Sequence, residues 1–183
     1  KSGGKLPPLF FASEKGLLQI YKISPEYLNF LRGFDPKVPN GYQGNKPFVG
    51  VIVPVDHHQY LAPLTSYKPK QDKIKSSQPT CVKLYELSNP DNKLGMIQLN
   101  NMVPILPSTV MLFDFEGQPG HYRSLLQRQY AYIRSVTEEI DEKAAKLYDL
   151  VVNKKHPLFT NLSCEFNVLE EKYVSYNSPD DLR

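Results

Sequence analysis

The sequence predicts a single α+β domain built on a mostly antiparallel sheet. The chain has 183 residues, which is enough for one domain with a sizeable core. Stretches with strand character gather in residues 17–115, whereas helical periodicity dominates residues 120–173. The strands and helices do not alternate as they would in a parallel sheet, so segregation into an α+β fold is expected.

Composition narrows the class of protein. The chain is 40% hydrophobic and 22% charged, which is typical of a folded soluble protein. A net charge of +3 permits a nucleic-acid partner without requiring one. The chain has 12 tyrosines and no tryptophan, and tyrosine can stack on bases and donate to phosphates. This balance favours RNA or DNA slightly, while the alternative is that most tyrosines are half-buried sheet residues.

Cysteine usage and hydropathy predict a cytoplasmic protein. Cys81 and Cys164 lack the spacing of metal ligands, and two cysteines are fewer than a secreted disulfide framework normally has. We therefore expect free thiols in a reducing compartment. The sequence shows no apolar run of membrane-spanning length and no signal peptide, so no membrane association is expected.

The first elements follow from local signals. Residues 17–23 predict a strand, and Ser24-Pro25 then has the pattern of a helix start, with serine as N-cap and proline in the first turn. Gly33 is placed to end that helix. Residues 1–16 contain Ser-Gly-Gly and Pro-Pro and are interpreted as a non-core extension or a cloning remnant, leaving residues 17–176 as the domain.

A β-hairpin is expected next. The apolar, β-branched residues 48–55 predict a buried strand, residues 56–58 a turn, and residues 59–64 the returning strand. His57 and His58 have no carboxylate or histidine companion in the sequence, so they are interpreted as turn residues rather than metal ligands.

Further short strands and then helices complete the domain. Residues 80–86 and 93–99 predict strands on either side of a turn at 89–92, and residues 102–106 and 109–115 predict short extended pieces. The first expected helix covers residues 120–134. A capping box at Ser135–Glu138 is expected to open a second helix, which residues 153–157 stop. An extended stretch at 163–166 and a last short helix at 167–173 follow. The second helix carries an apolar stripe: Ile140, Ala144, Leu147 and Val151. Residues 177–183 are expected to be a polar tail.

The candidate site lies where the hairpin ends. Strand residues up to Leu64 lead to two hydroxyl residues, Thr65 and Ser66, in a loop that continues into a lysine run. The lysines of the run are Lys68, Lys70, Lys73 and Lys75. A rigid strand end that presents hydroxyl and ammonium groups together can hold a phosphate and support chemistry beside it. The alternative is a solvated, lysine-rich loop without a function.

Absent motifs restrict the chemistry. The sequence has no glycine-rich phosphate loop, no zinc-protease or nucleophile-elbow motif, and no cluster of acidic residues suited to two metal ions. An enzyme of this composition would work without a metal or cofactor, on a substrate that supplies its own nucleophile, as the 2′-hydroxyl of RNA does. A serine hydrolase would need a histidine beside Ser66, which nothing in the sequence provides.

From residue 17 onward the chain resembles the ToxN/AbiQ family of type III toxin–antitoxin and phage abortive-infection systems. The most specific shared segment is Tyr60-Leu-Ala-Pro-Leu-Thr-Ser66 followed by Lys68. The other matching segments, in family order and at similar spacing, are Tyr21–Tyr27, Asp35–Asn40, Tyr42-Gln43 with Lys46 and Phe48, Lys93–Leu99, Met102–Ile105 and Leu169–Tyr173.

The resemblance implies a compact, highly twisted antiparallel sheet with flanking helices, similar to MazF/Kid-type toxins. It implies a metal-independent, cofactor-free endoribonuclease that leaves a 2′,3′-cyclic phosphate and a 5′-hydroxyl on cellular or phage RNA. The inhibitor would be an RNA: a small, repeated, pseudoknotted antitoxin that the toxin cuts from its precursor and binds in a closed assembly. The alternative is a non-catalytic RNA-binding domain on the same scaffold.

By position, the resemblance also implies the site residues. Ser66 would be the central catalytic residue, with Thr65 and Lys68 beside it, and Tyr27, Tyr42 and Lys46 would support them. We expect Lys68 to neutralise the phosphorane, and Ser66 and Thr65 to contact the scissile phosphate or relay a proton. Tyr27 and Tyr42 are expected to stack on or orient nucleotides. Lys46 is expected to hold a neighbouring phosphate. A general RNA-binding surface is expected from Lys70, Lys73, Lys75, Arg123 and Arg128. Tyr67 stands where the family pattern has proline, and residues 1–16 have no counterpart.

Overall fold

The sheet is organised around one long strand, β3 (His58–Ser66). The structure is a computed structural model that describes residues 19–40 and 48–178. On one side β3 pairs with β2 (Val49–Val55), from Val55 opposite His58 to Gly50 opposite Pro63. On its other side β3 meets two strands in succession, β6 (Val103–Pro104) opposite Tyr60 and Leu61, and β5 (Asn89–Gln98) opposite Leu64–Ser66.

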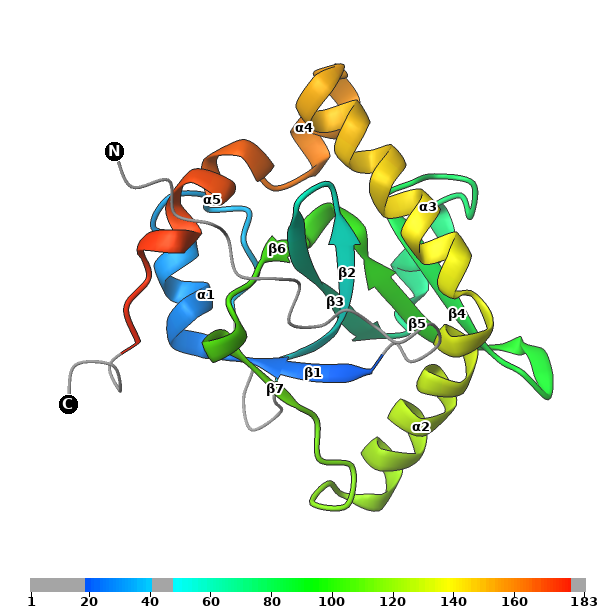
Figure 1. Cartoon of the computed structure of the whole chain (residues 1–183). Helices are drawn as coiled ribbons and strands as arrows, with labels where there is room; N and C mark the ends of the chain where they lie inside the picture. Colours follow the sequence, from blue (N-terminus) through cyan, green and yellow to red (C-terminus); the bar gives the residue numbers. More distant parts are fainter. Residues whose placement is uncertain (1–18, 41–47, 179–183) are drawn as a thin grey trace.

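The remaining strands extend the sheet at both edges. β1 (Ile20–Ile23) lies between β2 and the edge strand β7 (Val110–Leu112), and β4 (Cys81–Glu86) pairs with β5 at the opposite edge. The order β4-β5-β3-β2-β1-β7, with β6 also on β3, gives a strongly twisted sheet in which every described strand pair is antiparallel (Figure 1). The predicted α+β domain with flanking helices is therefore confirmed.

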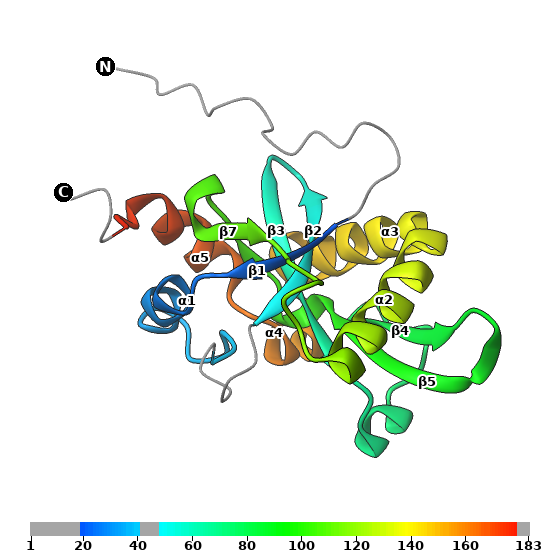
Figure 2. The same cartoon turned by 90° about the horizontal axis from the view of Figure 1, so that it is seen from below.

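Helices flank the sheet at two sides (Figures 1 and 2). The helices α1 (Pro25–Arg32) and α5 (Phe166–Lys172) lie at one side, and α2 (Gly120–Ser135) and α3 (Thr137–Tyr148) at the other. Helix α1 begins as predicted, because the Ser24 side chain accepts a hydrogen bond of 3.2 Å from the Tyr27 backbone N–H. The predicted stripe of α3, including Ile140 and Leu147, is buried in the core.

Two local predictions are wrong, and one helix was not predicted. Residues 89–92 do not form a turn: they start β5, and the turn lies at Leu87-Ser88. The predicted capping box does not form, because Ser135 continues α2 and its hydroxyl donates to the Tyr132 carbonyl at 2.6 Å. Residues 153–157 do stop the second helix, which ends in a π-helical turn (Asp149–Asn153), but an unpredicted helix, α4 (Pro157–Leu162), follows.

Several predictions fall on residues that the structure does not describe. Residues 1–16, Tyr42 and Lys46 lie outside the described ranges, as do residues 179–183 of the expected tail. In the parts of the chain that are described, no helix combines the length and the apolar character needed to cross a membrane.

Candidate functional site at the Ser66 end of β3

Two buried glutamines hold the backbone at the Ser66 end of β3. Gln71 lies in a 3₁₀ helix, η1 (Pro69–Lys73), and its amide nitrogen donates to the Ser66 carbonyl at 3.0 Å. Gln129 of α2 donates to the Thr65 carbonyl at 3.1 Å and to the Leu94 carbonyl of β5 at 2.8 Å. The two side chains are only 4% and 1% exposed, so these hydrogen bonds are protected from water and fix the strand end against both neighbouring elements.

A glycine allows β5 to approach this end closely. Gly95 pairs with Ser66 and has φ +140°, a conformation that other residues rarely adopt. A Cβ atom at this position would lie 1.8 Å from the Thr65 carbonyl oxygen. Glycine is therefore required opposite Ser66, and an isolated glycine inside the strand pattern of residues 93–99 is the sequence signal that marks it.

Ser66 and Lys68 present a hydroxyl and an ammonium group that are open to a substrate. Both are exposed, and Lys68 has extended backbone angles, so the alternation of an extended chain places the two side chains on the same side. Among residues 19–40 and 48–178, neither the Ser66 hydroxyl nor the Lys68 ammonium group has a hydrogen-bond or ion-pair partner. The prediction of a loop is wrong for Ser66 itself, because Ser66 is the last residue of β3 and is paired with β5.

Thr65 has a different environment from Ser66. Its hydroxyl donates to the Met96 carbonyl at 3.3 Å and accepts a hydrogen bond of 3.3 Å from Gln71. Because this hydroxyl is half-buried and already engaged, the structure favours a positioning role for Thr65 over direct contact with a phosphate.

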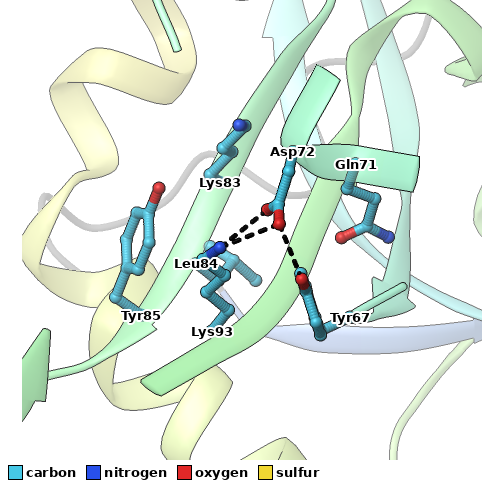
Figure 3. Close-up of a pocket in the computed structure, with 8 residues that line it drawn as sticks. Tyr67, Gln71, Asp72, Lys83, Leu84, Tyr85 and Lys93 are labelled. Atoms are coloured by element: carbon cyan, nitrogen blue, oxygen red, sulfur yellow. Dashed lines mark hydrogen bonds and ion pairs between the residues drawn. The ribbon is translucent and has the colours of Figure 1, made fainter. Parts of the chain in front are cut away.

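A charged cluster lies beside this strand end (Figure 3). The Tyr67 hydroxyl donates to Asp72 at 2.8 Å, and the Lys93 ammonium group lies 2.9 Å from both oxygens of that carboxylate. The Lys93 ammonium holds the pKa of Asp72 below its usual range, and the hydrogen bond to Asp72 raises the pKa values of Tyr67 and Lys93. Lys83 and Tyr85 line the same small pocket.

The predicted stacking role of Tyr27 is contradicted by its position. Its side chain is fully buried, and its hydroxyl donates to the Pro104 carbonyl at 2.6 Å. Burial raises the pKa of this hydroxyl well above its usual range. Pro104 pairs with Tyr60, which is about 20 Å along β3 from Ser66 at the usual rise per residue. Tyr27 therefore packs the core and cannot stack on a nucleotide in this arrangement.

The predicted RNA-binding residues fall into two groups. Lys70, Lys73 and Lys75 are exposed in and after η1, close to the Ser66 end. By contrast, Arg123 forms an ion pair with Glu116 at 3.1 Å, and Arg128 lies 3.6 Å from Glu86. Because their charges are partly neutralised within the chain, the two arginines contribute less to a positive surface than the lysines do.

A polar network at the opposite end of β3 was missed by sequence reasoning. The Glu170 carboxylate of α5 accepts hydrogen bonds from the hydroxyls of Tyr60 at 2.5 Å and Tyr148 at 3.1 Å. His58 Nε2 lies 3.7 Å from the same carboxylate, and its Nδ1 lies 3.1 Å from the Tyr173 hydroxyl. His58 therefore has the carboxylate companion that the sequence did not reveal, and it is a strand residue rather than a turn residue.

Two other types of site find no support here. No histidine is hydrogen-bonded to Ser66 in the part of the chain that the structure describes, which counts against a serine hydrolase. Within the same described residues, no three His, Cys, Asp or Glu side chains gather where they could hold a metal ion. Cys81 and Cys164 are free thiols, as predicted, and both are buried.

Known structures share this fold. A structure of a bacterial antiviral system regulated by a processed non-coding RNA superposes with a TM-score of 0.78 at 34% identity, covering 88% of this chain and 100% of that one. AbiQ, a lactococcal anti-phage endoribonuclease of the type III toxin–antitoxin systems, superposes with a TM-score of 0.78 at 29% identity, covering 87% and 97%. The architecture is thus that of a class of small anti-phage endoribonucleases.

The sequence itself defines the family. The endoribonuclease ToxN of Pectobacterium atrosepticum is 38% identical over 164 residues, which is 87% of this chain and 94% of that protein. The sequence model of the toxin ToxN of type III toxin–antitoxin systems matches residues 19–174. The chain belongs to this family, so the resemblance predicted from its motifs is confirmed.

Proposed function

We propose that this chain is an endoribonuclease toxin that cuts RNA without a metal ion. The observation that carries the proposal is the pair formed by Ser66 and Lys68: a hydroxyl and an ammonium group, both exposed and free of partners in the described residues, on a strand end that buried glutamines hold rigid. Such preorganised donors are suited to a phosphate that gains charge during the reaction. The matched family and relatives support RNA as the substrate.

The proposed reaction is an internal transfer within the RNA. The 2′-oxygen bonds to the adjacent phosphorus while the bond from phosphorus to the 5′-oxygen breaks. The 2′-hydroxyl loses its proton and the leaving 5′-oxygen gains one, so the products are a 2′,3′-cyclic phosphate and a 5′-hydroxyl. Lys68 stabilises the extra charge on the phosphorane, and Ser66 hydrogen-bonds a phosphate oxygen or relays a proton. Thr65 acts by holding the strand end, and Tyr42 and Lys46 remain proposed supporting residues by resemblance.

The proposed partner is an RNA antitoxin. The related antiviral structure with its processed non-coding RNA supports an RNA inhibitor for this chain. We infer that this inhibitor is a small repeated pseudoknot, that the toxin cuts it from a precursor, and that the two form a closed protein–RNA assembly in the bacterial cytoplasm. Release of the toxin during phage infection would then lead to cleavage of cellular or phage RNA. The active domain is proposed to span residues 17–176.

The test is cleavage of a mixed cellular RNA pool in the presence of EDTA by the wild-type chain and by Ser66→Ala. We expect discrete cuts with cyclic-phosphate ends from the wild type and none from the variant. Tight RNA binding without cutting by wild-type protein stripped of RNA would instead favour the non-catalytic RNA-binding domain. Cutting that EDTA abolishes would contradict metal independence.

A further inference from the structure

An aromatic hollow opens where the β4–β5 hairpin meets α2. It has a volume of about 340 Å³ and is lined by Tyr85, Glu86, Leu87, Pro90 and Tyr132. The Tyr85 and Tyr132 rings meet edge to face, with centroids 5.8 Å apart and an interplanar angle of 68°. This geometry does not stack the two ring faces on each other, so ring surface remains for a flat ligand. Leu87 is 57% exposed at the hairpin turn and forms an open apolar wall.

The Glu86 carboxylate is held in this hollow by one of its two oxygens, and the other oxygen is unpaired among the described residues. Oε2 of Glu86 accepts a hydrogen bond of 2.6 Å from the Asn92 side chain and lies 3.6 Å from Arg128. Oε1 has no partner among the residues that the structure describes, and the side chain is 24% exposed. The hollow therefore combines an aromatic lining with an oriented, unfilled hydrogen-bond acceptor.

The hollow lies two strands away from the proposed active site. Ser66 pairs with Gly95, and Gly95 pairs with Leu84, so these three residues form one row across β3, β5 and β4. At the usual spacing between strands, Leu84 lies about 10 Å from Ser66. Tyr85, the next residue, lines both the hollow and the pocket that contains Lys83 and Lys93 (Figure 3).

We propose that this hollow binds one unpaired base of the RNA, a few nucleotides from the cut, and selects a base that carries an amino group. The base stacks on the tyrosines, and its amino group donates to Glu86 Oε1, as single-stranded RNA is commonly read by stacking and by hydrogen bonds to base edges. Adenine, cytosine and guanine fit this acceptor. Uracil has no amino group, and its only edge donor, the N3–H group, lies between two carbonyl oxygens that the carboxylate repels. The inference rests on the proposed function in that RNA is the ligand.

The lysines between the hollow and Ser66 fit the same strand of RNA. Lys83 and Lys93 line the intervening pocket, so the phosphate that joins the selected base to the next nucleotide would pass cationic side chains. Lys93 is already paired with Asp72, which leaves Lys83 as the stronger candidate for this phosphate. Aromatic and cationic groups therefore follow one another from the hairpin toward the end of β3.

The test is a binding selection that does not depend on cutting. A pool of random ten-nucleotide RNAs is bound to Ser66→Ala protein, and the bound fraction is sequenced. We expect bases with an amino group to be enriched over uracil about tenfold at one position, the discrimination that a good base contact supplies. Adding Tyr85→Leu should reduce that enrichment and weaken overall RNA binding about tenfold.

The decisive variant is Glu86→Gln on the Ser66→Ala background. The new amide oxygen can still accept from Asn92, which turns the amide NH₂ toward the hollow and replaces an acceptor by a donor. We expect the preference at that position to disappear or to shift toward uracil, while Glu138→Gln, at an exposed position on α3, leaves it unchanged. Thermal unfolding of each variant verifies the fold.

The outcomes separate this inference from the nuclease proposal. An identical base profile for the parent and Glu86→Gln, or no base preference in the parent, overturns the amino-group subsite whether or not the wild type cuts RNA. A wild type that binds with the expected preference but never cuts overturns the nuclease proposal and keeps the subsite.

Discussion

The two ends of β3 differ in how their polar groups are satisfied. At the Tyr60 end, the hydroxyls of Tyr60 and Tyr148 and the His58 ring converge on the Glu170 carboxylate, and the Tyr60 side chain is fully buried. At the Ser66 end, the hydroxyl of Ser66 and the ammonium group of Lys68 are exposed and have no partner in the described parts of the chain. The Tyr60 end, where the polar groups are paired within the chain, is called the closed end below. The Ser66 end, where the hydroxyl and ammonium groups are unpaired among the described residues, is called the open end.

The difference leads us to expect that the Tyr60 end stabilises the fold and that the Ser66 end contacts the substrate. A buried network with all members paired stabilises one arrangement of the core, because breaking it leaves unsatisfied polar groups away from water. The open end gains nothing from its free hydroxyl and ammonium groups until a ligand arrives. Its rigidity comes from backbone contacts of Gln71 and Gln129 instead. We therefore expect substitutions at one end to change stability and substitutions at the other to change activity.

The largest expected effect is a loss of RNA cleavage in the Lys68→Ala variant. Removal of one group that stabilises the charged transition state lowers turnover by about 100- to 1,000-fold. Lys70→Ala is the matched control, since Lys70 is an exposed lysine two residues further on. Rates on one short RNA substrate give the comparison. Equal losses in the two variants would mean that Lys68 contributes only general charge.

The next effect is on stability at the open end itself. Gly95→Ala introduces a Cβ 1.8 Å from the Thr65 carbonyl at φ +140°, so the free energy of unfolding should fall by about 3 kcal/mol. Gly120→Ala is the control, because its Cβ would meet nothing within 4 Å. Urea unfolding measures both variants. A Gly95→Ala protein as stable as Gly120→Ala would show that β5 does not approach Ser66 as described.

A smaller loss of stability is expected at the closed end. Glu170→Ala removes the common acceptor of two tyrosine hydroxyls, one of them fully buried, and should lower the free energy of unfolding by about 2 kcal/mol while RNA cleavage persists. Glu171→Ala changes the adjacent, exposed glutamate and should have little effect on either. Loss of cleavage in folded Glu170→Ala would mean that the Glu170 network is needed for RNA cleavage as well as for stability.

Alkaline pH should lower the stability of the fold through its buried tyrosines. Burial raises the pKa values of Tyr27 and Tyr60 above those of unfolded tyrosine, near 10. Above pH 10 the unfolded chain loses these protons and the folded chain keeps them. The unfolding free energy is therefore undiminished below that pH and falls as pH rises, by about 1.4 kcal/mol per pH unit for each tyrosine.

The measurement is urea unfolding between pH 8 and 11. Tyr27→Phe should make the unfolding free energy fall less steeply with pH, by about 1.4 kcal/mol per pH unit. Tyr85→Phe serves as the control, because the Tyr85 side chain is only half-buried. The same slope for the wild type and Tyr27→Phe would be inconsistent with a buried, protonated Tyr27.

Local sequence signals predicted the elements whose causes are local. The Ser24 cap, the hairpin around Asp56 and the apolar stripe of α3 depend on neighbours a few residues away, and all three appear in the structure. The turn expected at residues 89–92 failed because pairing with β4 overrides the turn preference of those residues.

The candidate site was predictable only in part. Motif positions predicted Ser66 and Lys68 as site residues, and the structure leaves both side chains exposed. They could not show that Tyr27 is buried beneath Pro104, or that Gln71 and Gln129 hold the strand end, because these contacts join residues far apart in the chain. Burial and long-range hydrogen bonds are properties of packing, and a residue's type and spacing do not specify them.

The division of β3 into a stabilising and a reactive end is tested most directly by measuring cleavage and unfolding for Ser66→Ala and Tyr60→Phe in parallel. Ser66→Ala should lose at least about 100-fold in cleavage, with a change in stability within about 0.5 kcal/mol. Tyr60→Phe should lose about 1 kcal/mol of stability and keep its cleavage rate. Normal cleavage by Ser66→Ala, or a parallel loss of both properties in both variants, would contradict the account.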